Sequence, residues 1–437
     1  MKLHASYEGK IQHLARSKTS SKVVQFVILT LSVILVFIYY HYTHYILEKP
    51  NSIQFHTNAN LHARSITTRK DVNDQKVVLK PISNSRSNKS CDLFSGEWVV
   101  NPDGPYYTNE TCQMMQQHQN CMKFGRPDRD FLKWRWKPND CELQVFDPVK
   151  FMEMMKGKSL AFVGDSVARN HMQSLICLLT RVTYPTDVSN SSDENFKRYE
   201  YLEYNFTISM FWSPYLVKAE KTNPQDVSQP FKLYLDEFDE SWTFEIENYN
   251  YVIISSGQWF FRPIYFYTNR SFIGCLYCSE SDIRHYPTTF GYQKAWRTAF
   301  RAINSLKNFK GMVFLRSFVA SHFEGGDWNK GGDCVRTKPF KSNESVMADF
   351  NLEMYNTQLQ EYKIGEVGGR KNEIKFSLMD VTQIMQMRPD GHPSKYGHGP
   401  YKNASWPSDC VHWCLPGPID VWNDFLVELI KREETNR

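Results

Sequence analysis

The longest hydrophobic stretch of the chain lies near its N-terminus. Residues 23–47 contain no Asp, Glu, Lys or Arg, and the apolar segment Val23–Tyr40 has 18 residues, about the minimum length of a helix that spans a bilayer. Basic side chains precede this segment, and bulky tyrosines follow it where a cleaved signal peptide would have small residues. We therefore expect a cytoplasmic tail over 1–22 and an uncleaved transmembrane signal anchor over 23–47.

Residues 48–90 show little hydrophobic periodicity. They are rich in Ser, Asn, Thr and Lys, which predicts a flexible stalk. All ten cysteines and all eleven tryptophans lie from Cys91 onward. We therefore expect a folded luminal domain over 91–437.

The pattern beyond Cys91 predicts an α/β fold with a parallel sheet flanked by helices. Four short apolar runs, each followed by polar or helical sequence, are typical of buried parallel strands: Ser159–Val163, Tyr251–Ile254, Met312–Leu315 and Phe376–Met379. Helices are expected over Val167–Thr180 and Pro418–Lys431. Because ligands of such sheets bind beyond the carboxyl ends of the strands, we expect functional residues there.

Three further segments alternate between apolar and polar residues, which predicts antiparallel hairpins. They are Phe206–Trp212, Phe231–Leu235 and Trp242–Ile246. We expect these segments, together with Cys91–Phe146, to form a second, smaller lobe.

Composition narrows the class of protein. Hydrophobic residues make up 41% and aromatic residues 15% of the chain, which excludes wholesale disorder. The formal net charge is +5, but the positive excess lies in residues 1–22 and 48–90, so the part from Cys91 onward is mildly acidic. That part has no basic stripe and no zinc-finger spacing, so nucleic acid is not an expected partner.

Gly164-Asp165-Ser166 lies at the expected junction between the first strand and its helix. This position presents a serine hydroxyl to solvent, next to backbone N–H groups that can stabilise an oxyanion. The alternative is an ordinary turn in which Asp165 or Ser166 caps the helix, and the tripeptide alone favours that alternative.

Asp409 precedes His412 by three residues, just before the closing helix. If the segment makes one turn, the carboxylate can hold the imidazole through Nδ1 and leave Nε2 for a serine. A surface Asp and a packed His are the structural alternative. Together the two motifs predict Ser166 as nucleophile, His412 as general base and then acid, and Asp409 as the residue that orients it. A second pair, Asp390 and His392 in a Gly- and Pro-rich loop, is the weaker candidate.

Two other patterns have competing interpretations. Cys275 and Cys278 can form half of a zinc site or a redox motif, but no second such pair completes it, and a local disulfide is favoured in an oxidising lumen. The aromatic segment 131–136 can stack on sugar rings or pack between lobes, and packing is favoured. The chain also has seven N-x-S/T sequons, which fit a glycoprotein, at Asn88, Asn109, Asn190, Asn205, Asn269, Asn343 and Asn403.

Jointly these residues resemble the plant trichome birefringence-like family, which carries a polysaccharide O-acetyltransferase domain related to SGNH/GDSL hydrolases. The resemblance covers about four-fifths of the chain, from Cys91 to the closing helix. Its motifs are Cys91-Asp92-Leu93-Phe94-Ser95-Gly96-Glu97-Trp98, Trp134-Arg135-Trp136, Gly164-Asp165-Ser166 with Arg169-Asn170, and Asp409-Cys410-Val411-His412-Trp413-Cys414-Leu415-Pro416-Gly417.

Finer motifs resemble the clade that includes xyloglucan acetyltransferases and also mannan-active members. They are the segment His322–Cys334 and the segment Met387–Pro393. Two segments depart from the family pattern. Gly257-Gln258-Trp259 stands where many members have Gly-His-Trp, and Ser317-Phe318-Val319-Ala320 stands where Thr-Phe-Ser-Pro is usual.

The resemblance implies a type II Golgi membrane protein that acetylates a hemicellulose, with galactosyl side chains of xyloglucan as the acceptor. It implies a double displacement through an acetyl-Ser166 ester, with the backbone N–H of Ser166 in the oxyanion hole. Further oxyanion or acceptor-site candidates are Gly257, Asn170, Arg169 and Gln258. No bound cofactor or metal is expected, but an acetyl donor such as acetyl coenzyme A is required. A polysaccharide acetyl esterase and a non-enzymatic glycan-binding wall protein are the alternatives.

The resemblance also implies how the ten cysteines pair. It implies the disulfides Cys91–Cys141, Cys112–Cys177, Cys121–Cys414 and Cys334–Cys410, which leaves Cys275–Cys278 as the fifth pair.

Overall fold

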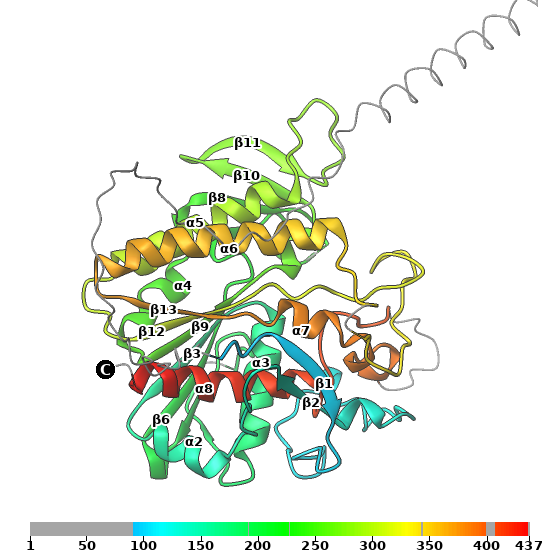
Figure 1. Ribbon diagram of the computed structural model, residues 1–437. Helices are drawn as coiled ribbons and strands as arrows, with labels where there is room; N and C mark the ends of the chain where they lie inside the picture. The colour runs from blue at the N-terminus through cyan, green and yellow to red at the C-terminus, as the bar shows by residue number, and fades with distance from the viewer. Residues whose placement is uncertain (1–90, 191, 227, 342–343, 399–406, 436–437) are drawn as a thin grey trace, which may run out of the picture. The chain divides into compact units, whose positions relative to one another are not determined.

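The computed structural model describes residues 91–437 except 191, 227, 342–343, 399–406 and 436–437 (Figure 1). The expected tail, anchor and stalk therefore lie outside the described residues. Within the described part, none of the helices has the length and apolar character needed to cross a bilayer.

A seven-stranded sheet forms the centre of the fold. Its order is β13 (Lys375–Met379), β12 (Met312–Arg316), β9 (Tyr251–Ser255), β3 (Ser159–Gly164), β6 (Phe206–Trp212), β5 (Arg198–Tyr201) and β4 (Thr186–Asp187). The strands from β13 to β6 run parallel, and β5 and β4 are antiparallel additions at one edge. The four parallel strands expected from the apolar runs are confirmed.

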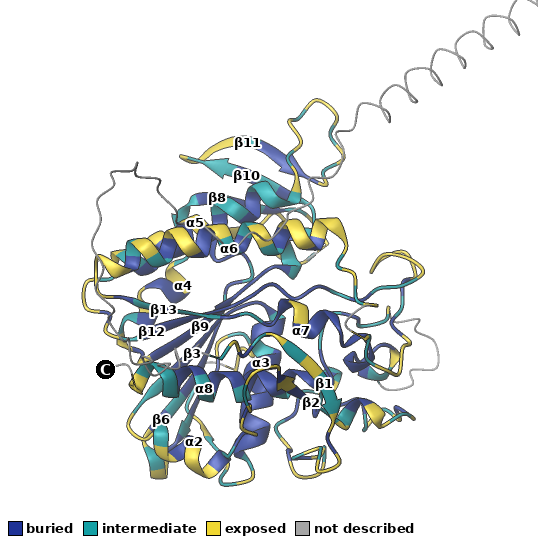
Figure 2. Cartoon of the chain, in the orientation of Figure 1, coloured by how far each residue is buried: buried dark blue, intermediate teal, exposed yellow. Residues whose placement is uncertain are grey.

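Both faces of this sheet are buried, which explains why its strands are continuously apolar. Along β3, Leu160 and Phe162 enter one hydrophobic core, whereas Ala161 and Val163 enter the other. Helices α2 (Pro148–Met154), α3 (Ser166–Leu179) and α8 (Val421–Thr435) cover the first face, and α5 (Thr288–Ser305) and α6 (Asp349–Arg370) cover the second (Figure 1). Figure 2 shows the central strands as a buried layer, with α3 largely buried on one side and α6 exposed along its outer face on the other. The short helix α7 (Thr382–Gln386) follows β13.

Two smaller sheets flank this core, and they do not form one lobe. A four-stranded sheet of β11 (Ser271–Leu276), β10 (Ile264–Thr268), β8 (Phe231–Phe238) and β7 (Val217–Lys221) packs in the core that contains α5. The hairpin of β1 (Gly96–Val100) and β2 (Trp134–Pro138) belongs to the core on the other face, where Leu93 and Trp136 are buried with residues of α3 and α8. The expected joining of Cys91–Phe146 to the second sheet is therefore wrong.

One of the three predicted hairpin segments, Trp242–Ile246, is wrong, and a second, Phe206–Trp212, is confirmed only in part. Phe206–Trp212 is β6, which pairs antiparallel with β5 as predicted, but it also pairs parallel with β3 and so lies inside the main sheet and not in a second lobe. Trp242–Ile246 is helical: α4 (Glu240–Thr243) begins after Asp239, whose carboxylate accepts a hydrogen bond from Ser241 N, and a 3₁₀ turn over Glu245–Asn248 follows. Trp242 and Ile246 are four residues apart and both fully buried, which one face of a helix allows. The segment Phe231–Leu235 does lie in an antiparallel pair, between β8 and β7.

Five disulfides tie the described residues together, with the pairing that the resemblance implies. They join Cys91 to Cys141, Cys112 to Cys177, Cys121 to Cys414, Cys275 to Cys278 and Cys334 to Cys410. Two of them end in the segment 409–414 that contains the predicted catalytic histidine. All the described residues belong to one compact unit.

Candidate active site

The junction between β3 and α3 presents Ser166. Strand β3 ends at Gly164 and α3 begins at Ser166, with Asp165 as the N-cap residue, whose carboxylate accepts a hydrogen bond from Val167 N at 3.0 Å. Because Asp165 supplies the cap, the Ser166 hydroxyl is not needed for that role. Gly164 has φ +149°, and a Cβ there would lie 1.8 Å from the Ser255 carbonyl oxygen of the neighbouring strand. Only glycine fits this turn.

Asp409 and His412 form the hydrogen-bonded pair that the spacing predicts. Asp409 Oδ2 lies 2.8 Å from His412 Nδ1, and Asp409 Oδ1 accepts the backbone N–H groups of Val411 and His412. Burial raises the pKa of Asp409, but the charge of His412 and these hydrogen bonds outweigh it and hold the pKa below its usual range. Burial lowers the pKa of His412, and Asp409 outweighs it, so the net pKa is raised. His412 is therefore a stronger base than an isolated buried imidazole.

The other ring nitrogen of His412 is available for catalysis. Nε2 is buried and has no hydrogen-bond partner among the described residues. Asp165 and Arg169, on either side of Ser166 in the sequence, are near enough to influence the pKa of His412. The free nitrogen therefore lies in the neighbourhood of the start of α3, as a general base for Ser166 requires.

Asn170 joins the segment 409–414, here called the histidine segment, to α3. Its Oδ1 accepts the backbone N–H of Trp413 at 2.7 Å, and its Nδ2 donates to the carbonyl of Trp413 at 3.2 Å. Asn170 is fully buried and lies four residues after Ser166, one helical turn along the same face. The structure therefore places Asn170 in a positioning contact that uses both ends of its amide.

The weaker Asp–His candidate is part of the support for this segment. Asp390 and His392 are buried and do not bind each other. Asp390 forms a two-point ion pair with Arg388, at 2.8 and 3.0 Å, and His392 Nδ1 lies 2.7 Å from the carbonyl oxygen of His412. Arg126 donates to the carbonyls of Asp390 and His392. This loop therefore supports the histidine segment through the contact between His392 and the backbone of His412.

The segment after β9 lies beside the β3–α3 junction, because β9 pairs with β3 up to Ser255 and Gly164. Gly257 follows in this segment, and a Cβ there would lie 2.5 Å from the ring of Phe318. Gln258 Nε2 donates to the carbonyl of Val319 at 2.6 Å. The two segments that depart from the family pattern are therefore in direct contact with each other.

Two further side chains surround the site. Arg169 donates to Asn195 Oδ1 at 2.8 Å and lies over the ring of Trp212, and burial lowers its pKa. His118, which the sequence analysis missed, packs edge-on against His412 with ring centroids 5.3 Å apart. Burial, and then the proximity of His412, lower the pKa of His118 to about 4, so this ring is neutral near pH 7. It lies outside every recognisable motif, so only the fold reveals it.

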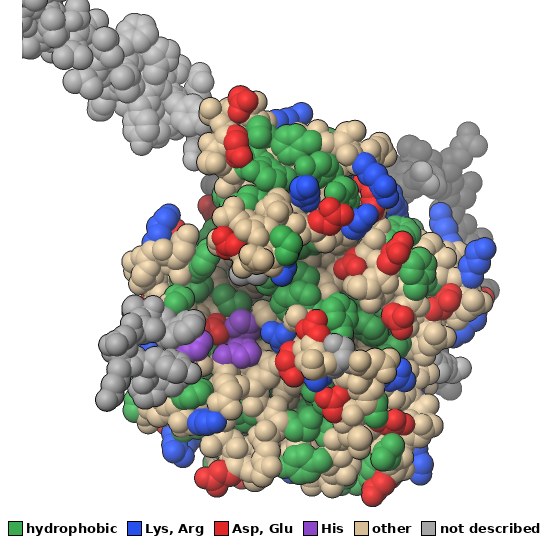
Figure 3. Space-filling model, turned by 180° about the vertical axis from the view of Figure 1, so that it is seen from behind, with side chains coloured by type: hydrophobic (Ala, Val, Ile, Leu, Met, Phe, Trp, Pro, Cys, Tyr) green, Lys and Arg blue, Asp and Glu red, His purple; other side chains and the backbone are tan. Residues whose placement is uncertain are grey.

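Histidine side chains gather in a hollow on one face of the molecule, bordered by hydrophobic side chains (Figure 3). A groove of about 630 Å³ begins at Trp212 and extends over β7 and β8 to the exposed side chain of Phe244. Its lining also includes Tyr215, Phe231 and the charged groups Asp239 and Arg270. Since Trp212 pairs with Gly164 and contacts Arg169, one end of this aromatic groove is next to the Ser166 turn.

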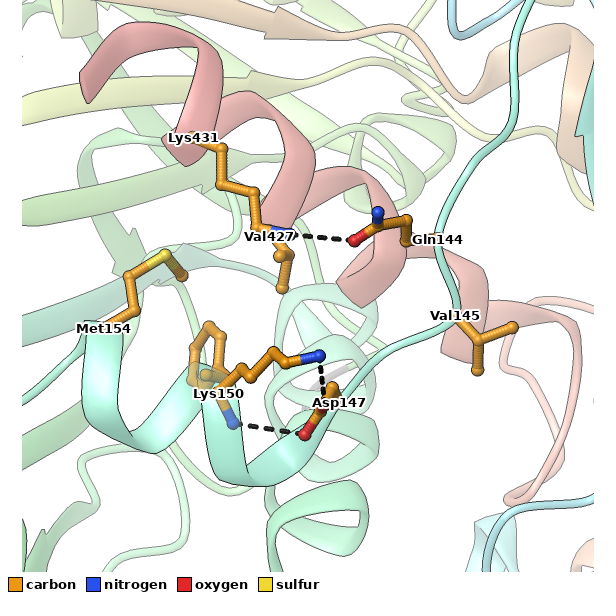
Figure 4. Close-up of a pocket in the computed structure, with 8 residues that line it drawn as sticks. Gln144, Val145, Asp147, Lys150, Met154, Val427 and Lys431 are labelled. Carbon is orange, nitrogen blue, oxygen red and sulfur yellow. Dashed lines mark hydrogen bonds and ion pairs between the residues drawn. The ribbon is translucent and has the colours of Figure 1, made fainter. Parts of the chain in front are cut away.

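A second pocket, of about 320 Å³, lies between α2 and α8 (Figure 4). It is lined by residues such as Phe151, Met154 and Val427, with the Gln144–Lys431 and Asp147–Lys150 contacts at its rim (Figure 4). None of the predicted site residues lines it, so we assign no function to it.

The remaining candidates have structural positions. The sulfur atoms of Cys275 and Cys278 are bonded to each other, so they are not thiolate ligands, although His285 lies close to them. Trp136 is buried against Trp98, which fits packing for the segment 131–136. Among the sequons, Asn190, Asn205 and Asn269 are exposed and Asn109 is half-buried, whereas Asn88, Asn343 and Asn403 lie outside the described residues.

Comparison with known proteins shows the family to which the chain is similar. Residues 143–429 match the model of a GDSL/SGNH-like acyl-esterase family found in Pmr5 and Cas1p, and residues 89–142 match the PMR5 N-terminal domain. The chain is 55% identical over 353 residues to protein trichome birefringence-like 19 of Arabidopsis thaliana, covering 80% of this chain and 82% of the relative. It is 41% identical over 361 residues to xyloglucan O-acetyltransferase 4 of Populus trichocarpa, covering 82% and 85%.

Proposed function

Since the chain belongs to the trichome birefringence-like family, we propose that it is a polysaccharide O-acetyltransferase that acts through Ser166, His412 and Asp409. The observation that carries the proposal is the hydrogen-bonded pair of Asp409 and His412, in which His412 Nε2 has no partner among the described residues. Asn170 holds the segment that contains this pair to α3, the helix that begins at Ser166.

The reaction proceeds in two transfers. In the first, His412 takes the proton of Ser166 while Oγ attacks the acetyl carbonyl of the donor, and the oxyanion receives hydrogen bonds from backbone N–H groups at the start of α3, with Gly257 as a further donor. The tetrahedral intermediate collapses to an acetyl-Ser166 ester, and His412 gives its proton to the leaving group. In the second, a sugar hydroxyl gives its proton to His412 and attacks the ester carbonyl. The bond between the acetyl carbon and Ser166 Oγ then breaks, His412 returns the proton to Oγ, and the acetylated sugar leaves.

We propose that the acceptor is a hemicellulose bound in the hollow and the aromatic groove, with galactosyl side chains of xyloglucan as the first choice. Support comes from the relatives named xyloglucan O-acetyltransferases and from the closeness of Trp212 to the Ser166 turn. Mannan is the alternative acceptor. The acetyl donor is a separate small molecule, and acetyl coenzyme A is the one to test first. We further propose that the protein is a type II Golgi membrane glycoprotein with this domain in the lumen.

The test compares purified full-length wild type with Ser166→Ala, using acetyl donor and a panel of xyloglucan and mannan oligosaccharides. Mass spectrometry should show acetylated product for the wild type and loss of at least 100-fold in rate for the variant, because removal of a catalytic serine can lower kcat by on the order of 10⁶. Undiminished transfer by Ser166→Ala would contradict the proposal. Release of free acetate from acetylated polymer, without transfer, would favour the esterase instead.

A further inference from the structure

Two buried histidines behind the catalytic segment form a continuous chain of contacts. His322 Nε2 lies 3.1 Å from the carbonyl oxygen of Gln386, His322 Nδ1 lies 2.7 Å from His392 Nε2, and His392 Nδ1 lies 2.7 Å from the carbonyl oxygen of His412. His322 is 8% exposed and His392 is 1% exposed. Solvent therefore takes little part in satisfying these rings.

The number of protons that this chain requires can be counted. A carbonyl oxygen only accepts hydrogen bonds, so the two outer nitrogens, His322 Nε2 and His392 Nδ1, must each carry a proton. A neutral imidazole carries one proton, so two neutral rings would face each other with bare lone pairs at 2.7 Å. The three contacts are all hydrogen bonds only when a third proton lies between the rings.

From this we propose that His322 and His392 share one proton beyond neutrality, and that this pair is a positioning device for His412 that is lost as the pH rises. The proposal rests on the proposed function insofar as His412 is catalytic. The shared proton lets His392 donate to the backbone carbonyl of His412 while His322 still bonds to Gln386. Without it, one of the three hydrogen bonds must break.

The surroundings of the pair accommodate a positive charge. The ring of His392 stacks on Trp413, with centroids 4.2 Å apart, and an aromatic face attracts a cation. The carboxylates near the pair are Asp390, Asp409 and Glu324, and the cation that faces it is Arg126. Asp390 is paired with Arg388, Arg126 with Asp128, and Glu324 with Arg336. Asp409 is hydrogen-bonded to His412, and while His412 is neutral the Asp409 carboxylate is the charge among these groups that can balance the shared proton.

The same surroundings make the proton one that can leave. Burial lowers the pKa of both imidazoles, most for His392, which also faces His322. The pair therefore holds its proton at acid pH and releases it to solvent as the pH rises. Because the pKa of His412 is raised whereas burial lowers the pKa of both rings of the pair, only the fraction of molecules in which the pair holds its proton while His412 is neutral is active, and that fraction declines on the alkaline side.

The test replaces the shared proton with a permanent donor. In His322→Asn, the amide nitrogen takes about the place of Nδ1 and donates to His392 Nε2 without titrating. We compare acetyl transfer by the full-length wild type, His322→Asn and the control His285→Asn, which changes an exposed histidine, from about pH 5 to 8. Wild type and control should show an alkaline limb that steepens toward tenfold per pH unit, and His322→Asn should lack it. Identical alkaline limbs in wild type and His322→Asn would overturn the proposal.

A second measurement does not depend on catalysis. In full-length protein labelled with ¹⁵N-histidine, the shared proton should give one N–H resonance far downfield that couples to ring nitrogens of both histidines. The intensity of this resonance should fall as the pH rises, and the resonance should be missing in His322→Asn. Neutral ¹⁵N shifts for both rings at acid pH would overturn the proposal. If acetyl transfer is absent but the downfield proton is present, the proposed function fails and the proton-sharing pair stands.

Discussion

The contact between Asn170 and Trp413 allows the positioning of the catalytic histidine to be separated from the chemistry. Asn170→Ala removes both hydrogen bonds that join α3 to the segment 409–414, and it leaves the backbone N–H and carbonyl of Trp413 without this partner. A net intramolecular hydrogen bond contributes about 1 kcal/mol, and each buried polar group left unpaired costs about 1–3 kcal/mol. We therefore expect the free energy of unfolding to fall by about 2–4 kcal/mol.

The effect on catalysis should exceed the effect on stability. His412 lies next to Trp413, and a displacement of about 1 Å in a catalytic group can lower the rate by about 100-fold. We expect kcat to fall by about that factor with little change in KM for the acceptor, because the groove at Trp212 is untouched. The assay is steady-state acetyl transfer together with thermal unfolding of the same preparations.

The matched control is Asn423→Ala in α8. Asn423 is also fully buried, and its Nδ2 donates to Ser174 at 2.9 Å, on α3 and not on the segment 409–414. It should lower stability and leave kcat within about threefold of wild type, since surrounding structure absorbs the loss. If Asn170→Ala and Asn423→Ala lower kcat equally, or Asn170→Ala leaves kcat unchanged, the positioning role assigned to Asn170 is refuted.

Two further predictions concern pH and acceptor binding. In Asp409→Asn, His412 loses the carboxylate that raises its pKa, and burial then lowers the pKa of His412. The acid limb of kcat, where His412 is protonated, should therefore move to lower pH. At the plateau, kcat should fall by about 100-fold or more. An acid limb that stays in place, measured over the same buffers, would count against His412 as the base. Trp212→Ala should raise KM for the oligosaccharide about tenfold, equivalent to about 1.4 kcal/mol, with kcat less affected. Trp134→Ala on β2, outside the groove, is the control, and an equal rise in KM for both variants would exclude the groove as the acceptor site.

The sequence predicted the parts of this fold that depend on local pattern. Four parallel strands and two helices follow from apolar runs, because a strand with both faces buried has no polar positions. The same logic misplaced Phe206–Trp212, which pairs antiparallel with β5 but lies in the main sheet, and it failed for Trp242–Ile246, since a short apolar segment fits a strand or a helix face equally well. Only tertiary packing decided among them.

In the candidate site, too, contacts between residues close in sequence were predictable, whereas contacts between separate segments were not. The Asp409–His412 contact spans three residues, so its spacing revealed it. His118, His322 and His392 reach the site from three separate segments, and no local pattern places them there. The contact between Gln258 and Val319 likewise joins segments about sixty residues apart, so the two departures from the family pattern were recognisable but their connection was not.

The disulfide between Cys121 and Cys414 has a consequence for biosynthesis. The two cysteines are separated by 293 positions, and Asp409, Cys410 and His412 lie in the same late part of the chain as Cys414. During translation, Ser166, the proposed nucleophile, therefore emerges long before the proposed base His412, the carboxylate of Asp409 and the second cysteine of this disulfide. A nascent or truncated chain would contain the turn at Ser166 but would lack His412 and Asp409. It would also lack the Cys121–Cys414 disulfide that holds their segment in place. Under the proposed mechanism, activity therefore depends on complete synthesis of the domain and on formation of the Cys121–Cys414 disulfide.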